Sequence, residues 1–153
     1  MLQGLDVERA TIAAISVGIA QGAFDVALKY STERKQFDVE IGKFQMIKKM
    51  LADMATETRA ARLLTYDAAS RVDHGEGNLT LDASMAKLFA SEVGTRVALQ
   101  AVQVLGGYGY ISEFPVERMA RDAKLLEIGA GTSEIQRLMI ARVWLKLLLM
   151  ILN

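Results

Sequence analysis

The chain contains no cysteine, one proline and one histidine among its 153 residues. The absence of cysteine excludes disulfides, thiol catalysis and thiolate metal sites. The single histidine, His74, lies in a polar stretch that is typical of a solvated loop, and no further ligand type gathers around it. We therefore predict no metal site. The single proline, Pro115, leaves room for long, uninterrupted helices.

The charges also exclude several classes of partner. Eighteen basic residues balance eighteen acidic ones, so we expect neither nucleic acid nor an anionic membrane surface as a partner. Residues 10–24 carry no charge, but this run is too short for a membrane span and includes Gln21, so it predicts a buried helix. No basic-then-apolar leader is evident, and a cytoplasmic location is expected.

Hydrophobic residues make up 52% of the chain, which is high for a small soluble monomer. This content predicts that some helix faces are buried against other subunits or against a further domain.

Apolar residues recur at three- and four-residue spacings, which is typical of amphipathic helices. They predict four major helices, at about residues 6–33, 40–72, 80–104 and 132–149. Gly106 and Gly107 end the third helix, and we expect an irregular segment after it with a short turn around residues 115–121. Helices of about 28 residues are roughly 40 Å long. Short connections between them favour one all-α domain over residues 1–153, folded as an antiparallel four-helix bundle.

Five short segments resemble motifs of the acyl-CoA dehydrogenases, in the order in which that family carries them. They are 33–37 (ERKQF), 44–45 (FQ), 103–110 (QVLGGYGY), 121–124 (RDAK) and 131–137 (GTSEIQR). The resemblance covers the C-terminal helical domain of the family, and its N-terminal helical and middle β domains have no counterpart in this chain. Asp38 departs from the family, which usually has glycine after the phenylalanine.

The resemblance implies α,β-dehydrogenation of an acyl-CoA thioester, in which a carboxylate removes the α-proton. The family commonly has a glutamate immediately before Gly-Thr, where this chain has Ala130. The segment 5–9 (LDVER) instead carries Glu8 where the isovaleryl-type branch keeps its base. Glu8 is therefore the predicted base, acting on a short branched acyl-CoA. The alternative is that Glu8 only complements the dipole of the first helix; Glu127 and Glu134 are fallback bases.

The rest of the predicted substrate site also follows from the resemblance. The backbone N–H of Ala130 would polarise the thioester carbonyl, and Gly129 would leave room for the acyl chain beside Gly131. Asp6 and Arg9 would steady the base and the substrate. The alternatives are a tight turn at the two glycines and an ordinary solvated arginine.

The resemblance further implies FAD. Arg34 resembles the side chain that contacts the pyrophosphate, because its planar fork matches phosphate oxygens. The other residues at flavin-contacting positions are Gln36, Phe37, Gln45, Gln103, Gly106, Gly107, Thr132 and Glu134. Without the resemblance, the Gly-Gly-x-Gly segment would be interpreted as a helix terminator, and Phe37 would be interpreted as a core residue.

Three partners follow: the acyl-CoA substrate, further copies of the chain in a dimer or tetramer, and electron-transfer flavoprotein as acceptor for the full enzyme. A eukaryotic source would place the protein in the mitochondrial matrix. Two alternatives stay open. One is a dehydrogenase of another short acyl-CoA, and the other is a non-catalytic helical module that self-assembles or contacts flavin.

Overall fold

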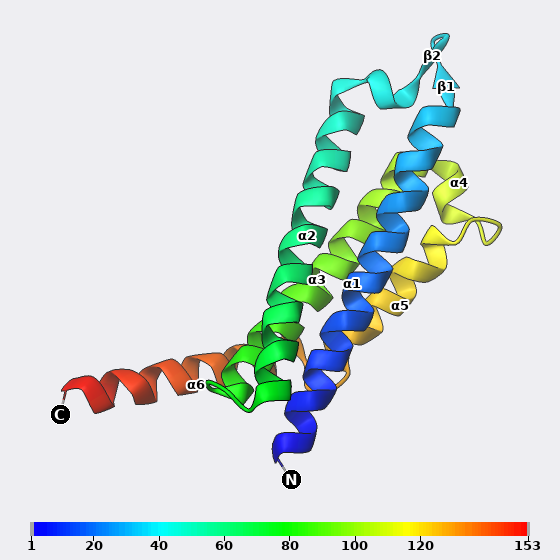
Figure 1. Ribbon diagram of the computed structural model, residues 1–153. Coiled ribbons are helices and arrows are strands. Elements are labelled where there is room, and N and C mark those ends of the chain that lie inside the picture. Colours follow the sequence, from blue (N-terminus) through cyan, green and yellow to red (C-terminus); the bar gives the residue numbers. More distant parts are fainter. Residues whose placement is uncertain (1, 153) are drawn as a thin grey trace.

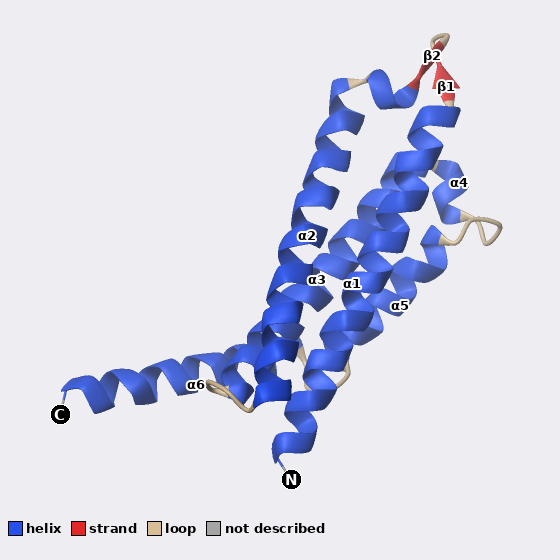
Figure 2. Cartoon of the chain, viewed as in Figure 1, coloured by secondary structure: helices blue, strands red, loops and turns tan. Residues whose placement is uncertain are grey.

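The computed structural model describes residues 2–152, and they are almost entirely helical (Figures 1 and 2), which confirms the all-α prediction. The helices are α1 (Leu2–Glu33), α2 (Gln45–His74), α3 (Leu79–Leu105), α4 (Gly107–Tyr110), α5 (Val116–Ile128) and α6 (Ser133–Leu152). A two-stranded antiparallel hairpin, β1 (Lys35–Gln36) and β2 (Val39–Glu40), and the 3-10 turn η1 (Ile41–Lys43) connect α1 to α2.

The bundle is built around α3, which packs against α1, α2, α5 and α6. Its contact with α1 is made of small residues, including Ala13, Ala20, Ala90 and Ala98, all of them buried. Small side chains let two helix backbones approach closely, so dispersion contacts accumulate along the whole seam. By length and composition α1 could cross a membrane, but its buried alanines make it a core helix of this bundle.

One prediction about the bundle is wrong. The segment expected to form a short turn at 115–121 is a 13-residue helix, α5, and it takes the fourth position of the bundle, beside α1 and α3. Its buried residues Val116, Ala123 and Leu126 form one narrow apolar stripe. The many charges between them hide this stripe in the sequence.

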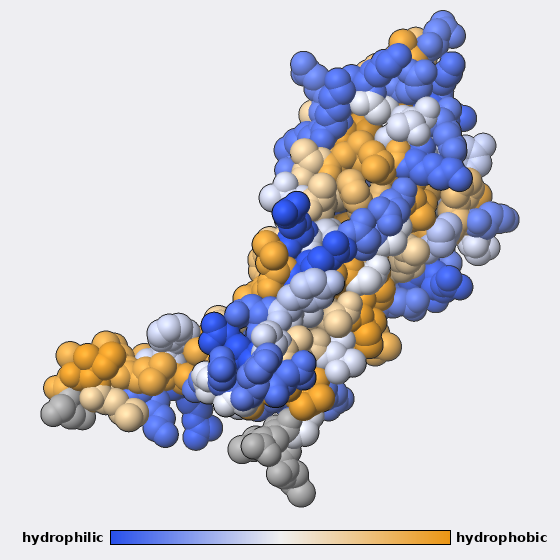
Figure 3. Space-filling view, in the orientation of Figure 1, coloured by the Kyte–Doolittle hydropathy of each residue, from blue (hydrophilic) through white to orange (hydrophobic). Residues whose placement is uncertain are grey.

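The last helix, α6, was expected within the bundle. It packs on α3 near its start and then leaves the bundle at a steep angle (Figure 1). Its outer half has apolar side chains on every side, so no single face can direct it onto α3, and Ile151 is 80% exposed. This apolar surface stands out in Figure 3. Large apolar side chains at this helix end are therefore exposed.

Close packing also decides where glycine is required. A Cβ on Gly109, in α4, would lie 2.5 Å from the carbonyl oxygen of Val102 in α3. A Cβ on Gly18, in the middle of α1, would meet nothing within 4 Å. We expect Gly109→Ala to lower the free energy of unfolding by about 1–3 kcal/mol, because backbone must shift. Gly18→Ala should raise it by about 1 kcal/mol through helix propensity.

Urea unfolding of the two variants and the parent chain measures both effects. Shifts of the same sign in both variants would contradict this account of the α3–α4 contact.

The hairpin turn holds two residues in the left-handed region, Phe37 at φ 53° and Asp38 at φ 64°. Positive φ at both central residues is what a two-residue type I′ turn requires, and glycine is usual there. We expect Asp38→Gly to be more stable than Asp38→Val by about 1–2 kcal/mol, because a β-branched residue is strained at positive φ. Thermal unfolding of both variants tests this. Equal stabilities would show that the turn changes conformation to relieve the strain.

Candidate functional site

The loop between α5 and α6 is held in an unusual backbone conformation. Ala130 has φ 53° and Gly131 has φ 94°. A Cβ on Gly131 would lie 2.8 Å from Nε2 of Gln136, so glycine is required there for space as well as for φ. The same Nε2 donates hydrogen bonds to the carbonyl oxygens of Ala130, at 3.1 Å, and Gly131, at 2.9 Å.

The backbone N–H of Ala130 makes no hydrogen bond to any residue in the described range 2–152. The loop carbonyls are bound from inside the protein, and this donor is left available. A fixed, unpaired N–H is what stabilises negative charge developing on a carbonyl oxygen.

A buried network connects the starts of α1 and α3. Arg9 donates to Asp6 across 3.0 Å, and the hydroxyl of Thr80 donates to the other carboxylate oxygen of Asp6 at 2.9 Å. Asp6 and Arg9 are both buried. The charge of Arg9 also lowers the pKa of Lys87, although burial is the larger cause. Because Lys87 binds the α5–α6 loop, the start of α1 and that loop lie at the same end of the bundle (Figure 1).

Glu8 forms none of the hydrogen bonds of this network and is exposed. The two fallback bases are less suited to proton abstraction. Burial raises the pKa of Glu127, but hydrogen bonds from Lys124, at 2.6 Å, and from Thr95 outweigh it, so the net pKa is lowered. Hydrogen bonds from its own backbone N–H and from the Thr132 hydroxyl lower the pKa of Glu134. Both side chains are thereby weakened as bases.

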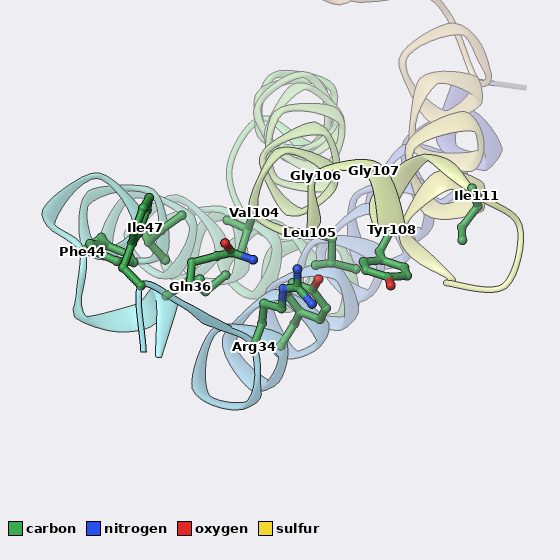
Figure 4. Close-up of a pocket in the computed structure, with 13 residues that line it drawn as sticks. Arg34, Gln36, Phe44, Ile47, Val104, Leu105, Gly106, Gly107, Tyr108 and Ile111 are labelled. Atoms are coloured by element: carbon green, nitrogen blue, oxygen red, sulfur yellow. The ribbon is translucent and has the colours of Figure 1, made fainter. Parts of the chain in front are cut away.

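A large pocket lies at the opposite end of the bundle, next to the hairpin (Figure 4). It has a volume of about 590 Å³. Its lining is formed by Tyr30, Arg34, Gln36, Phe37, Ile41, Phe44, Ile47, Val104, Leu105, Gly106, Gly107, Tyr108 and Ile111. Five of the predicted flavin-contacting residues are therefore brought together: Arg34, Gln36, Phe37, Gly106 and Gly107.

Arg34 is the only cation in the lining of this pocket. Its guanidinium carbon lies 5.8 Å from the centre of the Tyr108 ring, and among the described residues it forms no ion pair. Stacking on an aromatic face orients a guanidinium while its N–H groups stay free for an anion. Phe37 is 88% exposed and touches the Phe44 ring edge-on. It is therefore no core residue.

The remaining predicted cofactor residues are dispersed. Gln45 and Gln103 are exposed and do not line the pocket. Thr132 and Glu134 lie at the start of α6, at the far end of the bundle, where the Thr132 hydroxyl accepts a hydrogen bond from the N–H of Ile135 at 3.4 Å. Arg9 and Arg34 mark the two ends and are 25 positions apart along the first helix, which corresponds to roughly 38 Å.

Sequence reasoning missed Lys87 and Gln136, both fully buried and both bound to the α5–α6 loop. It also missed Tyr108, which orients Arg34. One signal was available: Lys87 is a single cation on the otherwise small and apolar face formed by Ala83, Ala86 and Ala90.

Comparison with known proteins gives a consistent result. The sequence model of the family "Acyl-CoA dehydrogenase, C-terminal domain" matches residues 1–145. A probable acyl-CoA dehydrogenase of Bacillus subtilis is 56% identical over 145 residues, which are 95% of this chain and 38% of that protein. The mitochondrial isovaleryl-CoA dehydrogenase of Oryza sativa is 49% identical over 93% of this chain and 34% of its own length.

The structure of butyryl-CoA dehydrogenase from Megasphaera elsdenii superposes with a TM-score of 0.90 at 44% identity, covering 92% of this chain and 37% of that one. The chain thus spans little more than a third of the length of these relatives. The part that it spans corresponds to the C-terminal domain. The chain belongs to the acyl-CoA dehydrogenase family, as its C-terminal domain.

Proposed function

We propose that this chain is the C-terminal part of an FAD-dependent acyl-CoA dehydrogenase that uses Glu8 as the base and acts on a short branched acyl-CoA. The observation that carries the proposal is the available N–H of Ala130, which lies where the family commonly keeps a glutamate. The electrophilic half of the site is retained without its carboxylate. Glu8 is exposed at the same end of the bundle, whereas Glu127 and Glu134 are engaged in other hydrogen bonds.

The residues of this chain would act as follows. The N–H of Ala130 binds the thioester carbonyl oxygen and stabilises the enolate charge that develops there. Glu8 takes the α-proton from the substrate once bound acyl-CoA has displaced water from the carboxylate. Asp6 and Arg9, buried and paired, hold the first turns of α1 against α3 and so fix the height of Glu8 along the bundle.

The pocket beside the hairpin fits part of a flavin dinucleotide. The guanidinium of Arg34 forms no ion pair within the described residues and would donate its N–H groups to the pyrophosphate. Gly106, at φ 61°, would let the backbone approach the nucleotide. When bound, FAD accepts the hydride that leaves the β-carbon.

Thr132 and Glu134 lie at the end of the bundle near Arg9, which is roughly 38 Å along the first helix from Arg34. We infer that each flavin contacts two copies of the chain, one through each end of the bundle. The exposed Phe37 and the uncovered apolar end of α6 support a dimer or tetramer. Electron-transfer flavoprotein is the proposed acceptor, in the cytoplasm or, in a eukaryote, in the mitochondrial matrix.

The test uses a flavin-loaded fusion in which this chain replaces the matched segment of the Bacillus subtilis relative. We expect Glu8→Gln to slow anaerobic flavin reduction by isovaleryl-CoA by about 10²–10⁴-fold, because a general base contributes that much. The matched control is Glu76→Gln, an exposed acid in the α2–α3 loop. Equal rates in parent and Glu8→Gln would show that another carboxylate is the base.

The two base positions should also be interchangeable. On a Glu8→Gly background, we expect Ala130→Glu to restore part of the lost reduction rate, because a carboxylate would then stand where the family commonly has its glutamate. A double mutant that folds and binds FAD but stays inactive would count against this.

Reduction of the parent fusion by butyryl-CoA alone would favour the second candidate, a dehydrogenase of another short acyl-CoA. A colourless oligomer would favour a non-catalytic module.

Arg34 gives a separate prediction for FAD. We expect Arg34→Gln to weaken FAD binding to the fusion by roughly 10–100-fold, the value of one or two hydrogen bonds to a charged group. Arg34→Lys should recover only part of this, because an ammonium lacks the planar fork. Equilibrium dialysis with FAD measures the effect, with Arg59→Gln as an exposed control. Unchanged binding in Arg34→Gln would remove this residue from the cofactor site.

A further inference from the structure

Lys87 lies in the first half of α3, and its side chain is fully buried, with 0% exposure. Lysine is almost never buried in this way unless a carboxylate pairs with it. Among the described residues, no carboxylate forms an ion pair with Lys87. Its Nζ instead donates to two backbone carbonyl oxygens, those of Glu127 at 3.0 Å and Gly131 at 2.9 Å.

These two carbonyls flank the segment 128–130. One belongs to the last turn of α5, where the carbonyls have no partner within the helix and carry the negative end of its dipole. The other lies just before α6. A single ammonium therefore closes the loop at both ends and fixes the distance between the two helices across it.

Gln136 completes the arrangement from the α6 side. Its Nε2 binds the carbonyl oxygens of Ala130 and Gly131, so Gly131 accepts from both Gln136 and Lys87. With the carbonyls tied to the interior, the peptide planes of the loop have little freedom to rotate. The N–H of Ala130, a residue with left-handed φ, lies between these bound carbonyls and takes part in none of their hydrogen bonds.

The charged groups around Lys87 come from four helices, and they shift its pKa in both directions. Burial lowers the pKa of Lys87, and so does Arg9 of α1, whereas Glu127 of α5, Glu134 of α6 and Glu92 of α3 raise it. The carboxylate of none of these acids forms an ion pair with Nζ. Hydrogen bonds from an ammonium polarise the peptide groups that accept them, and do so more strongly where water is excluded.

We propose that Lys87 is a positioning residue for the dehydrogenation: it clamps the α5–α6 loop so that the N–H of Ala130 meets the acyl thioester carbonyl oxygen. This inference rests on the proposed function. Lys87 does not touch the substrate and acts through the backbone of the loop. The site then depends on three parts of the chain. Lys87 of α3 holds the α5–α6 loop, Ala130 of that loop provides the N–H donor, and Glu8 of α1 provides the base.

The first experiment needs no flavin and uses the 153-residue chain. We expect single, sharp amide resonances for residues 128–132 in the parent chain. In Lys87→Met, which preserves length without donors or charge, these resonances should broaden or split. Lys124→Met, which removes an exposed lysine on α5, serves as the matched control. Resonances that stay sharp and unshifted in a folded Lys87→Met chain would overturn the clamp.

The second experiment uses the flavin-loaded fusion and ¹³C-labelled acyl-CoA. We expect Lys87→Met to slow flavin reduction by about 100-fold, as loss of an oxyanion-stabilising donor does, with acyl-CoA affinity within about fivefold of the parent. The carbonyl stretch of the bound thioester should return towards its frequency in water. Lys124→Met should change neither. A lower unfolding temperature with unchanged rate and carbonyl frequency would mean that Lys87 is merely structural, and would overturn the proposal.

If Lys87→Met does not fold, Lys87→Gln, which keeps a neutral donor, decides in the same way: a slower rate and a shifted carbonyl band support the proposal, and parental values of both overturn it. A parent fusion that neither binds acyl-CoA nor is reduced by it defeats the proposed function. In that case the amide spectra of the unfused chain still report separately on the clamp.

Discussion

The close contact between α1 and α3 is the constraint on which the rest of the structure depends. Alanines line both helices along this seam, and Gly94 of α3 brings it within van der Waals reach of the backbone of Ser16 in α1. Because the two backbones approach so closely, neither helix can rotate or slide without creating a clash or a void. The positions of Glu8 on α1 and Lys87 on α3 are thereby set relative to each other. The bundle thus acts as a rigid frame for two chemically distinct ends.

The polar groups at the two ends of the bundle differ in how far they are buried and in whether they are bonded to other residues of the chain. At the end near the start of α1, polar and charged groups are buried and bonded to one another: Asp6 with Arg9 and Thr80, and Lys87 with loop carbonyls. Hydrogen bonds of this kind, formed where water is excluded, fix the geometry of the groups that they join. At the hairpin end, the side chains of Arg34 and Phe37 are exposed, and the Arg34 guanidinium forms no ion pair within the described residues. The first end is organised within one copy of the chain, whereas the second offers groups to a ligand or to a further copy.

Much of the architecture could be read from periodicity. The predicted helices at 6–33, 40–72 and 80–104 correspond to α1, α2 and α3 within a few residues at most ends. The reading failed at α5, where Val116, Ala123 and Leu126 form a stripe too narrow to stand out among charges. It also failed for the direction of α6, because the outer half of this helix is apolar around most of its circumference and does not indicate which side should face the bundle.

The sequence by itself determined the family, because five motifs in order are a strong signal, and it determined that Ala130 cannot be a base, since a methyl group has no proton acceptor. It also determined that position 8 has a carboxylate, which can accept a proton, and that position 34 has a guanidinium, which can bind an anion. Only the tertiary structure decided that Asp6 and Arg9 are a buried pair and that the loop at Ala130 is closed by Lys87 and Gln136. The predicted flavin contacts likewise proved to lie at opposite ends of the bundle. The physical reason is that the bonds of Asp6 to Thr80 and of Lys87 to Glu127 and Gly131 join residues 40 or more positions apart, and no local pattern encodes such contacts.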